Sequence, residues 1–417
     1  MNADVVVIGA GPAGMMASIF AAENGASVIL TEKNEKTGRK LRITGKGRCN
    51  LTNDSDVKEV LANIPGDGRF LYSALTAFPP ERVMRFFEER GLPLKTERGK
   101  RVFPQSDRAN DVADLLQRLC QNSGVRILHD EVKGISLQNG KVRGVKTDSG
   151  LISCKSCVVC TGGLSYPLTG STGDGYRFAK AAGHTIVQPR PSLVPLESPD
   201  PCCARLQGLS LKNIELRVYE NEKMLCRDQG EMLFTHFGVS GPLVLSASAR
   251  MRHFDAASYR LEIDLKPALD EKTLDLRIQR DLKKYQNREL RNALFDLVPH
   301  ALVPELLRVS EAPETVRANE VTREIRSRLL HSLKAFPIEV SGTRPFAEAI
   351  VTAGGVNTRE IDPRSMQSKL VPGLFFAGEV LNLDAYTGGF NLQIAWSTGR
   401  TAGISAAQSS MKNEQDE

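Results

Sequence analysis

Three glycines near the start of the chain have the spacing of a phosphate-binding turn. Gly9, Gly11 and Gly14 form the pattern G-x-G-x-x-G directly after an apolar run from Val5 to Ile8. In such a turn the first glycine makes a tight bend, the second lets the backbone approach a diphosphate, and the third lets a helix pack closely on a strand. The helix that follows directs free amides and a positive dipole end at the phosphates. The spacing therefore predicts a dinucleotide site.

An acid at the end of the next predicted strand supports this prediction. The strand Ser27 to Thr31 ends at Glu32, which follows the glycines at about the 20-residue spacing typical of such sites. A carboxylate at that position accepts hydrogen bonds from ribose hydroxyls and disfavours a 2′-phosphate. An ordinary glycine-rich turn does not account for Glu32.

Two further strands end in glycine and polar residues suited to a cofactor. The strand Ser156 to Cys160 stops at Thr161-Gly162-Gly163, and the apolar strand Gly373 to Phe376 is followed by Gly378-Glu379. Glycines at strand ends let a backbone pass close to a ligand. Gly388, Gly389, Phe390 and Asn391 then lead into a helical run over 392–407, whose first amides can face an anionic or electron-accepting ring edge.

These elements must be positioned by a nucleotide fold that the middle of the chain interrupts. We expect an α/β Rossmann-type domain made of residues 1–190 and 338–417, which includes a hairpin around Asn139-Gly140. Residues 191–337 form an inserted substrate domain, β-rich over 191–268 and helical over 269–337. A proline-rich linker with Pro189, Pro191, Pro195, Pro199 and Pro201 opens the insertion. We expect this insertion to supply a second wall of the substrate site.

Composition excludes several classes of protein. With 417 residues, 41% apolar and 25% charged, the chain is too hydrophobic for a disordered class. The N-terminus has no basic leader, and no apolar stretch reaches the roughly 18 residues of a membrane span. A cytoplasmic protein with reduced cysteines is expected. The net charge of +6 is spread among acids, so we expect a small-molecule substrate and no nucleic acid. The sequence does not specify an oligomeric state.

One group of basic residues and one group of cysteines have a spacing that could suggest a nucleic-acid site and a metal site, but a simpler role accounts for each group. The one dense basic cluster is Lys33, Lys36, Arg39, Lys40, Arg42, Lys46 and Arg48, for which a diphosphate is the simplest partner. Cys154, Cys157 and Cys160 have the spacing of a metal site, but residues three apart on a strand point to opposite faces, and no metal site is expected.

Longer segments resemble one family. Similarity to the BaiN-like family of bacterial NAD(P)/FAD-dependent oxidoreductases, within the glutathione-reductase-type FAD superfamily, extends over Gly38 to Leu41, Thr44 to Asn53, Gly170 to Gly175, Leu233 to Pro242 and Tyr386 to Gly389. The resemblance implies a split FAD domain with an insertion.

The residues expected to contact non-covalent FAD come from the glycine turns and from this resemblance. They are Gly9, Gly11, Pro12, Ala13, Gly14, Glu32, Lys33, Arg39, Lys40, Gly45, Gly47, Arg48, Cys49, Asn50, Val132, Thr161, Gly162, Gly163, Gly378, Glu379, Gly388, Gly389, Phe390 and Asn391. Cys49 has no second cysteine a few residues away, as a redox pair requires, so we favour a structural role for it.

The reaction is the least specified feature. The name-giving relatives imply NAD(P)H-driven reduction of a carbon–carbon double bond conjugated to a ketone in a bulky, bile-acid or steroid-like substrate. A flavin-dependent amine oxidase that uses oxygen and a non-catalytic flavoprotein that binds RNA or protein are alternatives. NADH or NADPH would bind transiently, since the chain has no second G-x-G-x-x-G. Candidate proton donors are His236, Tyr386 and Tyr166, although a buried structural role for His236 is an equal alternative.

Overall fold

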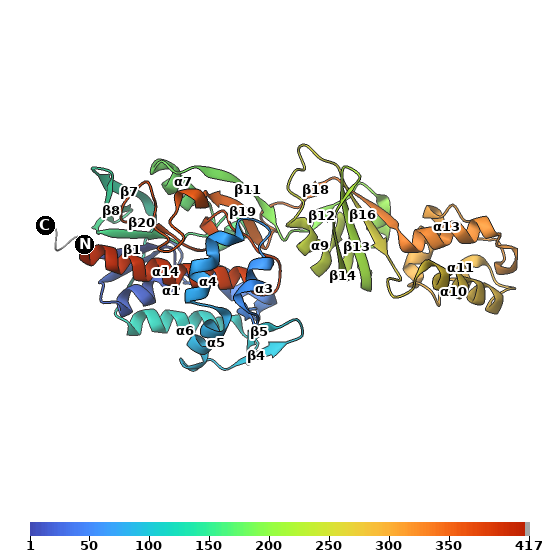
Figure 1. Cartoon of the computed structure of the whole chain (residues 1–417), viewed down its shortest axis with the longest axis horizontal. Helices are drawn as coiled ribbons and strands as arrows, with labels where there is room; N and C mark the ends of the chain where they lie inside the picture. Colours follow the sequence, from blue (N-terminus) through green and yellow to red (C-terminus); the bar gives the residue numbers. More distant parts are fainter. Residues whose placement is uncertain (413–417) are drawn as a thin grey trace. The chain divides into compact units, whose positions relative to one another are not determined.

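The chain folds into two compact units. The computed structural model describes residues 1–412. One unit comprises Met1–Ser192 together with the chain from Phe346 onwards, and the other is Leu193–Pro345 (Figure 1). Each unit has its own cluster of buried apolar side chains. We call the first the nucleotide-fold unit and the second the inserted unit.

A parallel sheet forms the centre of the nucleotide-fold unit. Its order is β20-β10-β1-β2-β6, and the bounds are β1 Val5–Ile8, β2 Val28–Glu32, β6 Arg126–His129, β10 Ser156–Val159 and β20 Leu374–Phe376. Every residue of β1, β2, β10 and β20 is buried, which explains their continuous apolar character, since helices cover both faces of such sheets. The chain therefore has the α/β Rossmann fold that the sequence predicts.

The sheet register brings distant segments to one edge. Ile8 pairs with Thr31 and with Val159, and Val159 pairs with Phe376, all in parallel strands. Consequently the residues that follow these strands lie side by side at the carboxyl edge of the sheet. Ligands of open α/β sheets bind at this edge, where the strand order reverses direction.

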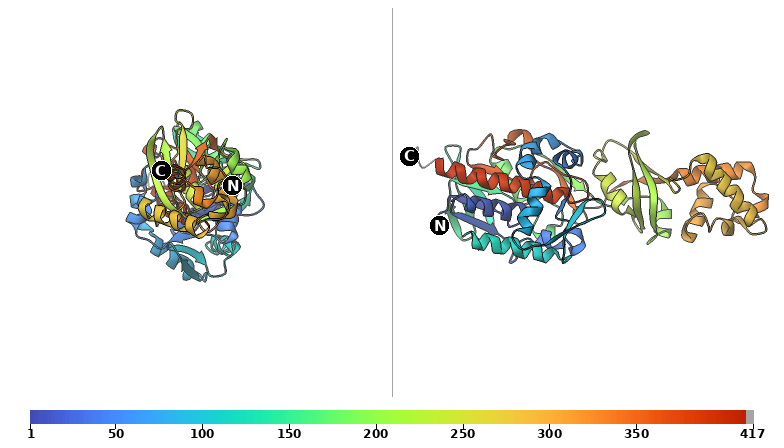
Figure 2. Two further views of the ribbon diagram at one scale, coloured as in Figure 1. Left: turned by 90° about the vertical axis from the view of Figure 1, so that its right-hand side faces the viewer. Right: turned by 60° about the horizontal axis from the view of Figure 1, so that its bottom comes forward.

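Two long helices, one from each end of the chain, pack against each other in this unit. They are α1 (Pro12–Glu23) and α14 (Phe390–Lys412), which lie side by side in both views (Figures 1 and 2). A Cβ atom at Gly399 would lie 2.4 Å from the carbonyl oxygen of Ala13, and one at Gly403 would lie 2.2 Å from that of Ala17. These two glycines are required because the helix backbones touch.

Smaller elements complete the nucleotide-fold unit. The remaining helices are α2 Arg39–Ile43, α3 Val57–Ala62, α4 Tyr72–Ala77, α5 Pro80–Glu88, α6 Ala109–Asn122 and α7 Asp174–Ala181. Three small sheets are β3-β5-β4 (Thr52–Asn53, Arg101–Pro104, Leu94–Glu97), β7-β8-β9 (Val132–Gln138, Lys141–Thr147, Gly150–Ser153) and β11-β19 (Ile186–Ser192, Val351–Val356). The predicted hairpin is confirmed, since Asn139 and Gly140 both have the positive φ of its turn, 50° and 75°.

The inserted unit joins a sheet to a group of helices. The sheet order is β17-β16-β13-β14-β15-β12-β18, with bounds Phe336–Val340, Tyr259–Asp264, Ser210–Glu220, Lys223–Thr235, Gly238–Ser240, Leu196–Glu197 and Gly342–Thr343. All of its pairings are antiparallel. The helices are α8 Pro201–Arg205, α9 Pro242–Ser248, α10 Glu271–Lys284, α11 Leu290–Ala293, α12 Val303–Val309 and α13 Arg323–Lys334. In the described part of the chain, every helix is too short or too polar to traverse a lipid bilayer.

Two expectations about the insertion differ from the structure. The proline-rich segment does not begin as a free linker, because Pro189 and Pro191 lie in β11, which pairs with β19 through an irregular register after Val187. Proline is tolerated there because a two-stranded sheet consists of edges only. The insertion also ends later than residue 337, since Phe336–Val340 is a strand that pairs with β16.

Candidate cofactor site

The turn after β1 has open space at one of its three glycines. Gly9 has a φ of 99°, and a Cβ there would lie 2.7 Å from the carbonyl oxygen of Cys160. A Cβ at Gly14 would lie 1.9 Å from the carbonyl oxygen of Gly9. Gly11, in contrast, has a φ of −80° and no atom within 4 Å of an added Cβ. The packing of the chain requires Gly9 and Gly14 but not Gly11, which leaves space for a ligand at the turn.

The start of α1 supplies the donors that a diphosphate needs. Pro12 is the first helical residue, and the earliest amide bonded back along the helix is that of Met15, which donates to the Gly11 oxygen at 2.9 Å. The amides of Ala13 and Gly14 therefore have no acceptor within the helix. They lie at the positive end of the helix dipole, beside the open space at Gly11. The observed turn fits the diphosphate of a dinucleotide.

Glu32 both supports this turn and offers acceptors. Its carboxylate is buried, with Oε2 accepting from the Ala10 amide at 3.0 Å and Oε1 accepting from the Asn34 amide at 2.9 Å and from its side chain at 2.6 Å. Oε1 already accepts two hydrogen bonds, whereas Oε2 accepts one and can accept a further one. The carboxylate is thus held in one orientation, and Oε2 can still accept from a ribose hydroxyl.

A substitution at this position tests the ribose contact. Glu32→Ala should weaken FAD binding by about tenfold to a hundredfold, because a hydrogen bond to a charged group contributes about 1.5 to 3 kcal/mol. Equilibrium dialysis of the apoprotein with FAD measures the change. Glu35→Ala removes the same charge from an exposed neighbour and should leave the dissociation constant unchanged. Equal constants for wild type and Glu32→Ala would exclude Glu32 from the site.

Glu379 and Lys40 connect four segments at the carboxyl edge of the sheet. The Lys40 ammonium lies 2.7 Å from the Glu379 carboxylate and donates to Ser165 Oγ at 2.5 Å. Glu379 also accepts from Ser165 Oγ at 2.8 Å and from the Thr352 amide at 2.9 Å. The charges of this pair compensate each other. Ser165 and Thr352 were not anticipated, because their partners lie far away in the sequence and carry no local signal.

The glycines before α14 are held by the segment that includes β3. A Cβ at Gly389 would lie 2.3 Å from the Thr52 oxygen, and Asn53 Nδ2 donates to the Gly388 oxygen at 3.0 Å. With its amide oriented to satisfy both groups, Asn50 accepts from the Gly389 amide at 3.0 Å. The side chain of Asn391 bonds both the amide and the oxygen of Ala385, at 2.9 and 2.8 Å. These contacts fix the start of α14, where the sequence predicts the second cofactor contact.

The loop from Gly45 to Asn50 is built around strained backbone and a buried thiol. Gly45 and Lys46 are both left-handed, with φ of 57° and 58°, and Cys49 has a φ of 61°. Cys49 is fully buried, and this burial raises the pKa of its thiol to about 12. A thiol in this environment stays protonated and packs as a small hydrophobe, which matches the structural role we favoured.

Several residues of the basic cluster are neutralised by the chain itself. Arg48 lies 2.5 Å from both Glu97 and Asp107, with its guanidinium over the ring of Phe103. Lys33 pairs with Asp174 at 2.7 Å. Arg42 pairs with Asp114, and Arg39 donates to Asn34 Oδ1. The cluster is therefore not a free cationic surface. These charges should contribute less to the binding of a diphosphate than their number suggests.

The remaining expected contacts are spread over the same unit. Gly162 has a φ of 73°, and a Cβ at Gly163 would lie 2.4 Å from Thr352 Oγ1. Val132 is buried at the start of β7, and Gly47 is exposed. Among the described residues, no group of three or more His, Cys, Asp or Glu side chains is arranged to hold a metal ion, and Cys154, Cys157 and Cys160 are all buried.

The three candidate proton donors do not share one unit. Tyr166 and Tyr386 belong to the nucleotide-fold unit, where both are partly buried and Tyr166 adopts a left-handed φ of 52°. His236 belongs to the inserted unit, in the turn between β14 and β15. It is exposed and lies edge-on to Phe237 at 5.0 Å between ring centroids. The alternative of a buried structural role for His236 is therefore wrong, because the side chain is exposed.

A family model covers almost the whole chain. The model described as the HI0933-like protein Rossmann domain matches residues 3–405. The chain belongs to the HI0933-like family of FAD-dependent oxidoreductases. The family membership expected from the sequence motifs is confirmed. In this family member, the open turn at Gly11, the free amides of α1 and the Glu32 carboxylate fit FAD.

Curated relatives of this HI0933-like protein act on different substrates. The 3-dehydro-bile acid delta(4,6)-reductase of Clostridium scindens is 30% identical over 407 residues, which are 96% of this chain and 98% of that protein. The ribosomal RNA dihydrouridine synthase of Escherichia coli is 32% identical over 400 residues, 95% and 96% of the two chains. That of Haemophilus influenzae is 31% identical over 410 residues, 97% and 98%.

Solved structures support the fold. A 3-ketosteroid-delta4-(5alpha)-dehydrogenase from Rhodococcus jostii RHA1 has a TM-score of 0.52 and 17% identity, covering 97% of each chain. At this identity the likeness concerns the fold alone. It supports a Rossmann-type unit with an insertion.

Proposed function

We propose that this protein uses FAD to reduce a carbon–carbon double bond conjugated to a carbonyl, and that the bond is the C5–C6 bond of a uridine in ribosomal RNA. The observation that carries the proposal is that relatives of both names match at least 95% of the chain, inserted unit included. Dihydrouridine is uridine reduced at C5–C6, next to the C4 carbonyl. A 3-dehydro-bile acid with a delta(4,6) system presents the same type of bond. The two kinds of relative therefore share one reaction type.

This reaction makes specific demands on the side chains. Bound FAD, once reduced by the electron donor, would supply hydride to the carbon β to the carbonyl, while the protein orients the substrate and excludes water. An acid must give a proton to the α-carbon, and donors must bond the carbonyl oxygen as negative charge develops there. His236, Tyr386 and Tyr166 are our candidates for the acid. We propose NADH or NADPH as the electron donor, bound transiently.

A second candidate substrate is a bulky apolar 3-oxo compound such as a bile-acid intermediate. The Clostridium scindens relative favours it, at 30% identity over nearly its whole length. The sequence led us to expect a small-molecule substrate and no nucleic acid, but we rank the RNA substrate first because two relatives, at 32% and 31% identity, are named for it. The inserted unit also carries several exposed basic side chains on and after α10, more than the single carboxylate of a bile acid requires.

Two half-reactions distinguish the candidates. Anaerobic NADH or NADPH should bleach the flavin absorbance of the purified protein. A mixture of in vitro transcripts of the large and small ribosomal RNAs, which contain no dihydrouridine, should then restore the absorbance, and mass spectrometry of their nucleosides should detect dihydrouridine. A 4,6-dien-3-oxo bile acid should leave the flavin reduced.

Other outcomes would replace this proposal. Reoxidation by the bile acid and not by the RNA would establish the second candidate. Bleaching by an amine followed by peroxide release would indicate an oxidase, and a flavin reduced by neither donor would indicate a non-catalytic flavoprotein. Heat or acid should release intact FAD, since we expect non-covalent binding.

A further inference from the structure

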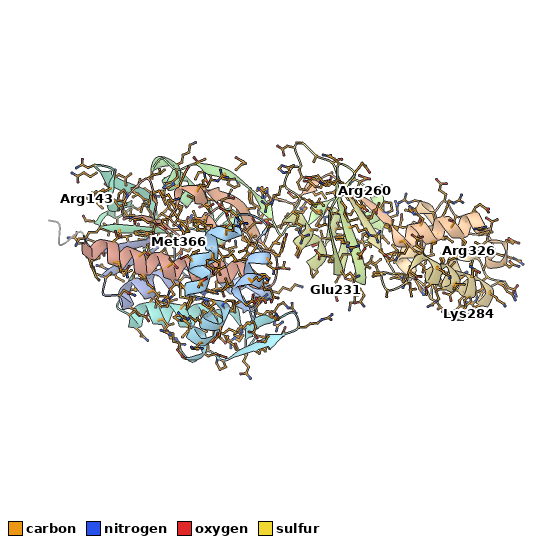
Figure 3. All side chains as sticks on the ribbon, viewed as in Figure 1. Arg143, Glu231, Arg260, Lys284, Arg326 and Met366 are labelled. Atoms are coloured by element: carbon orange, nitrogen blue, oxygen red, sulfur yellow. The ribbon has the colours of Figure 1, made fainter. Side chains whose placement is uncertain are left out.

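Exposed basic side chains gather at one end of the helical part of the inserted unit. Arg280, Lys283 and Lys284 lie on the last turns of α10, Arg288 lies between α10 and α11, and Arg291 lies in α11. The side chains of Arg280, Lys284 and Arg291 are 69%, 58% and 54% exposed. Lys284 lies at the periphery of this helical part (Figure 3). We call these five residues the cationic surface.

Three of these charges are not neutralised by the chain. Within residues 1–412, neither the Lys283 ammonium nor the Arg288 guanidinium has a carboxylate partner, and the guanidinium lies 5.1 Å from the centroid of the Tyr285 ring. Arg280 lies 3.8 Å from Asp281, but that carboxylate is already bonded by Arg277 at 2.6 Å. Lys284 and Arg291, in contrast, are paired with Asp296 and Glu289 at 2.7 Å. An excess of positive charge is therefore exposed at this surface.

A second segment extends the cationic surface. Arg317 forms an antiparallel bridge with Glu289, and the Ala318 amide donates to the Arg288 oxygen at 2.9 Å. The exposed Arg317 side chain thus comes from the segment before η5 (Ala318–Glu320) to the same place. Exposed amides at Gln286 and Asn287 add neutral hydrogen-bond donors between the charges.

An aromatic ring contacts two of the charges. The Lys284 ammonium lies 4.6 Å and the Arg288 guanidinium 5.1 Å from the centroid of the Tyr285 ring, whose hydroxyl donates to Asp296 at 2.5 Å. The ring orients both cations without reducing their charge. Spaced cations with amide donors match a polyphosphate chain, and guanidinium groups bind phosphate oxygens in pairs.

We propose that the cationic surface binds the phosphate backbone of the RNA substrate. This inference rests on the proposed function, because the RNA bound by the cationic surface is the same molecule whose uridine is reduced. Phosphate contacts position a nucleic acid without reading its sequence. The inserted unit would thus contribute affinity and orientation, while the nucleotide-fold unit carries the cofactor.

The test removes the three uncompensated charges from the full-length holoprotein. R280Q/K283Q/R288Q should weaken binding to the ribosomal RNA transcript that serves as substrate by about tenfold or more at moderate salt. Each lost phosphate contact should also make the plot of log K against log salt concentration less steep by about 0.7 to 0.9, thus by about 2 to 3 for the triple variant. Fluorescence anisotropy across a salt series measures both quantities. Lys283→Gln alone should change the slope by about 1.

A control variant removes the same charge from another surface of the inserted unit. K212Q/K223Q/R227Q alters exposed residues of β13 and β14 and should leave affinity and slope as in wild type. FAD content and thermal unfolding of both variants establish that each is folded.

The possible failures are distinguishable. Equal affinity and slope for the two triple variants would reject the cationic surface, whether or not uridine is reduced. RNA binding that depends on these residues in a protein that reduces no uridine would reject the proposed function and keep the surface. Binding to phosphatidylserine vesicles that is lost in R280Q/K283Q/R288Q while RNA binding is unchanged would assign the surface to a membrane and overturn the inference.

Discussion

Gly11→Val should remove FAD from the protein and leave its fold intact. The backbone at Gly11, with φ of −80° and ψ of −174°, is extended and suits valine, and no protein atom lies within 4 Å of the new Cβ. The side chain would instead fill the space expected to hold the diphosphate. Loss of about two charge-assisted hydrogen bonds to the amides of α1 costs roughly 3 to 6 kcal/mol. FAD affinity should then fall by about 10²- to 10⁴-fold.

Gly14→Ala provides the contrast. Its Cβ would lie 1.9 Å from the Gly9 oxygen, so this variant should lose thermal stability even without cofactor. Dialysis against FAD and thermal unfolding of both apoproteins separate the effects. Full FAD affinity in Gly11→Val would show that the open space at the turn is not a ligand site.

The second large effect is expected at His236. If His236 is the general acid, His236→Ala should leave FAD content and NADH-driven flavin reduction unchanged. The oxidation of the reduced flavin by substrate should slow by about 10² to 10⁴, the range for a lost general acid. The exposed ring, which contacts only Phe237 among the aromatic side chains described, is available to a substrate. Because the side chain is exposed, its removal should change stability little.

A matched control separates a specific from a general effect. His331→Ala removes another exposed imidazole of the inserted unit, on α13, and should leave both half-reactions unchanged. Stopped-flow absorbance of each half-reaction gives the rates. Equal substrate-dependent rates for wild type and His236→Ala would exclude His236 as the general acid. The variants Tyr386→Phe and Tyr166→Phe would then test the two remaining candidates.

The sequence by itself determined the local parts of the cofactor site. The strand, the glycine turn, the helix and Glu32 follow one another within a short segment, so their spacing alone identifies a dinucleotide fold. The sequence also predicts the Asn139-Gly140 turn and the apolar strands before Thr161 and Gly378. The conformation of each of these elements depends on residues nearby in the sequence, and the structure contains each of them.

Long-range contacts decided what the sequence left open. Spacing assigns Gly9, Gly11 and Gly14 together, but only the packed neighbours reveal that Gly11 alone has open space. The basic cluster suggested a diphosphate, yet the partners of Lys40 and Arg48 are carboxylates distant in sequence, and no local pattern predicts such a pairing. Likewise Pro189 belongs to a strand because β19, far along the chain, pairs with β11. A charge or a proline acquires its role from the atoms around it, and those are set by the tertiary fold.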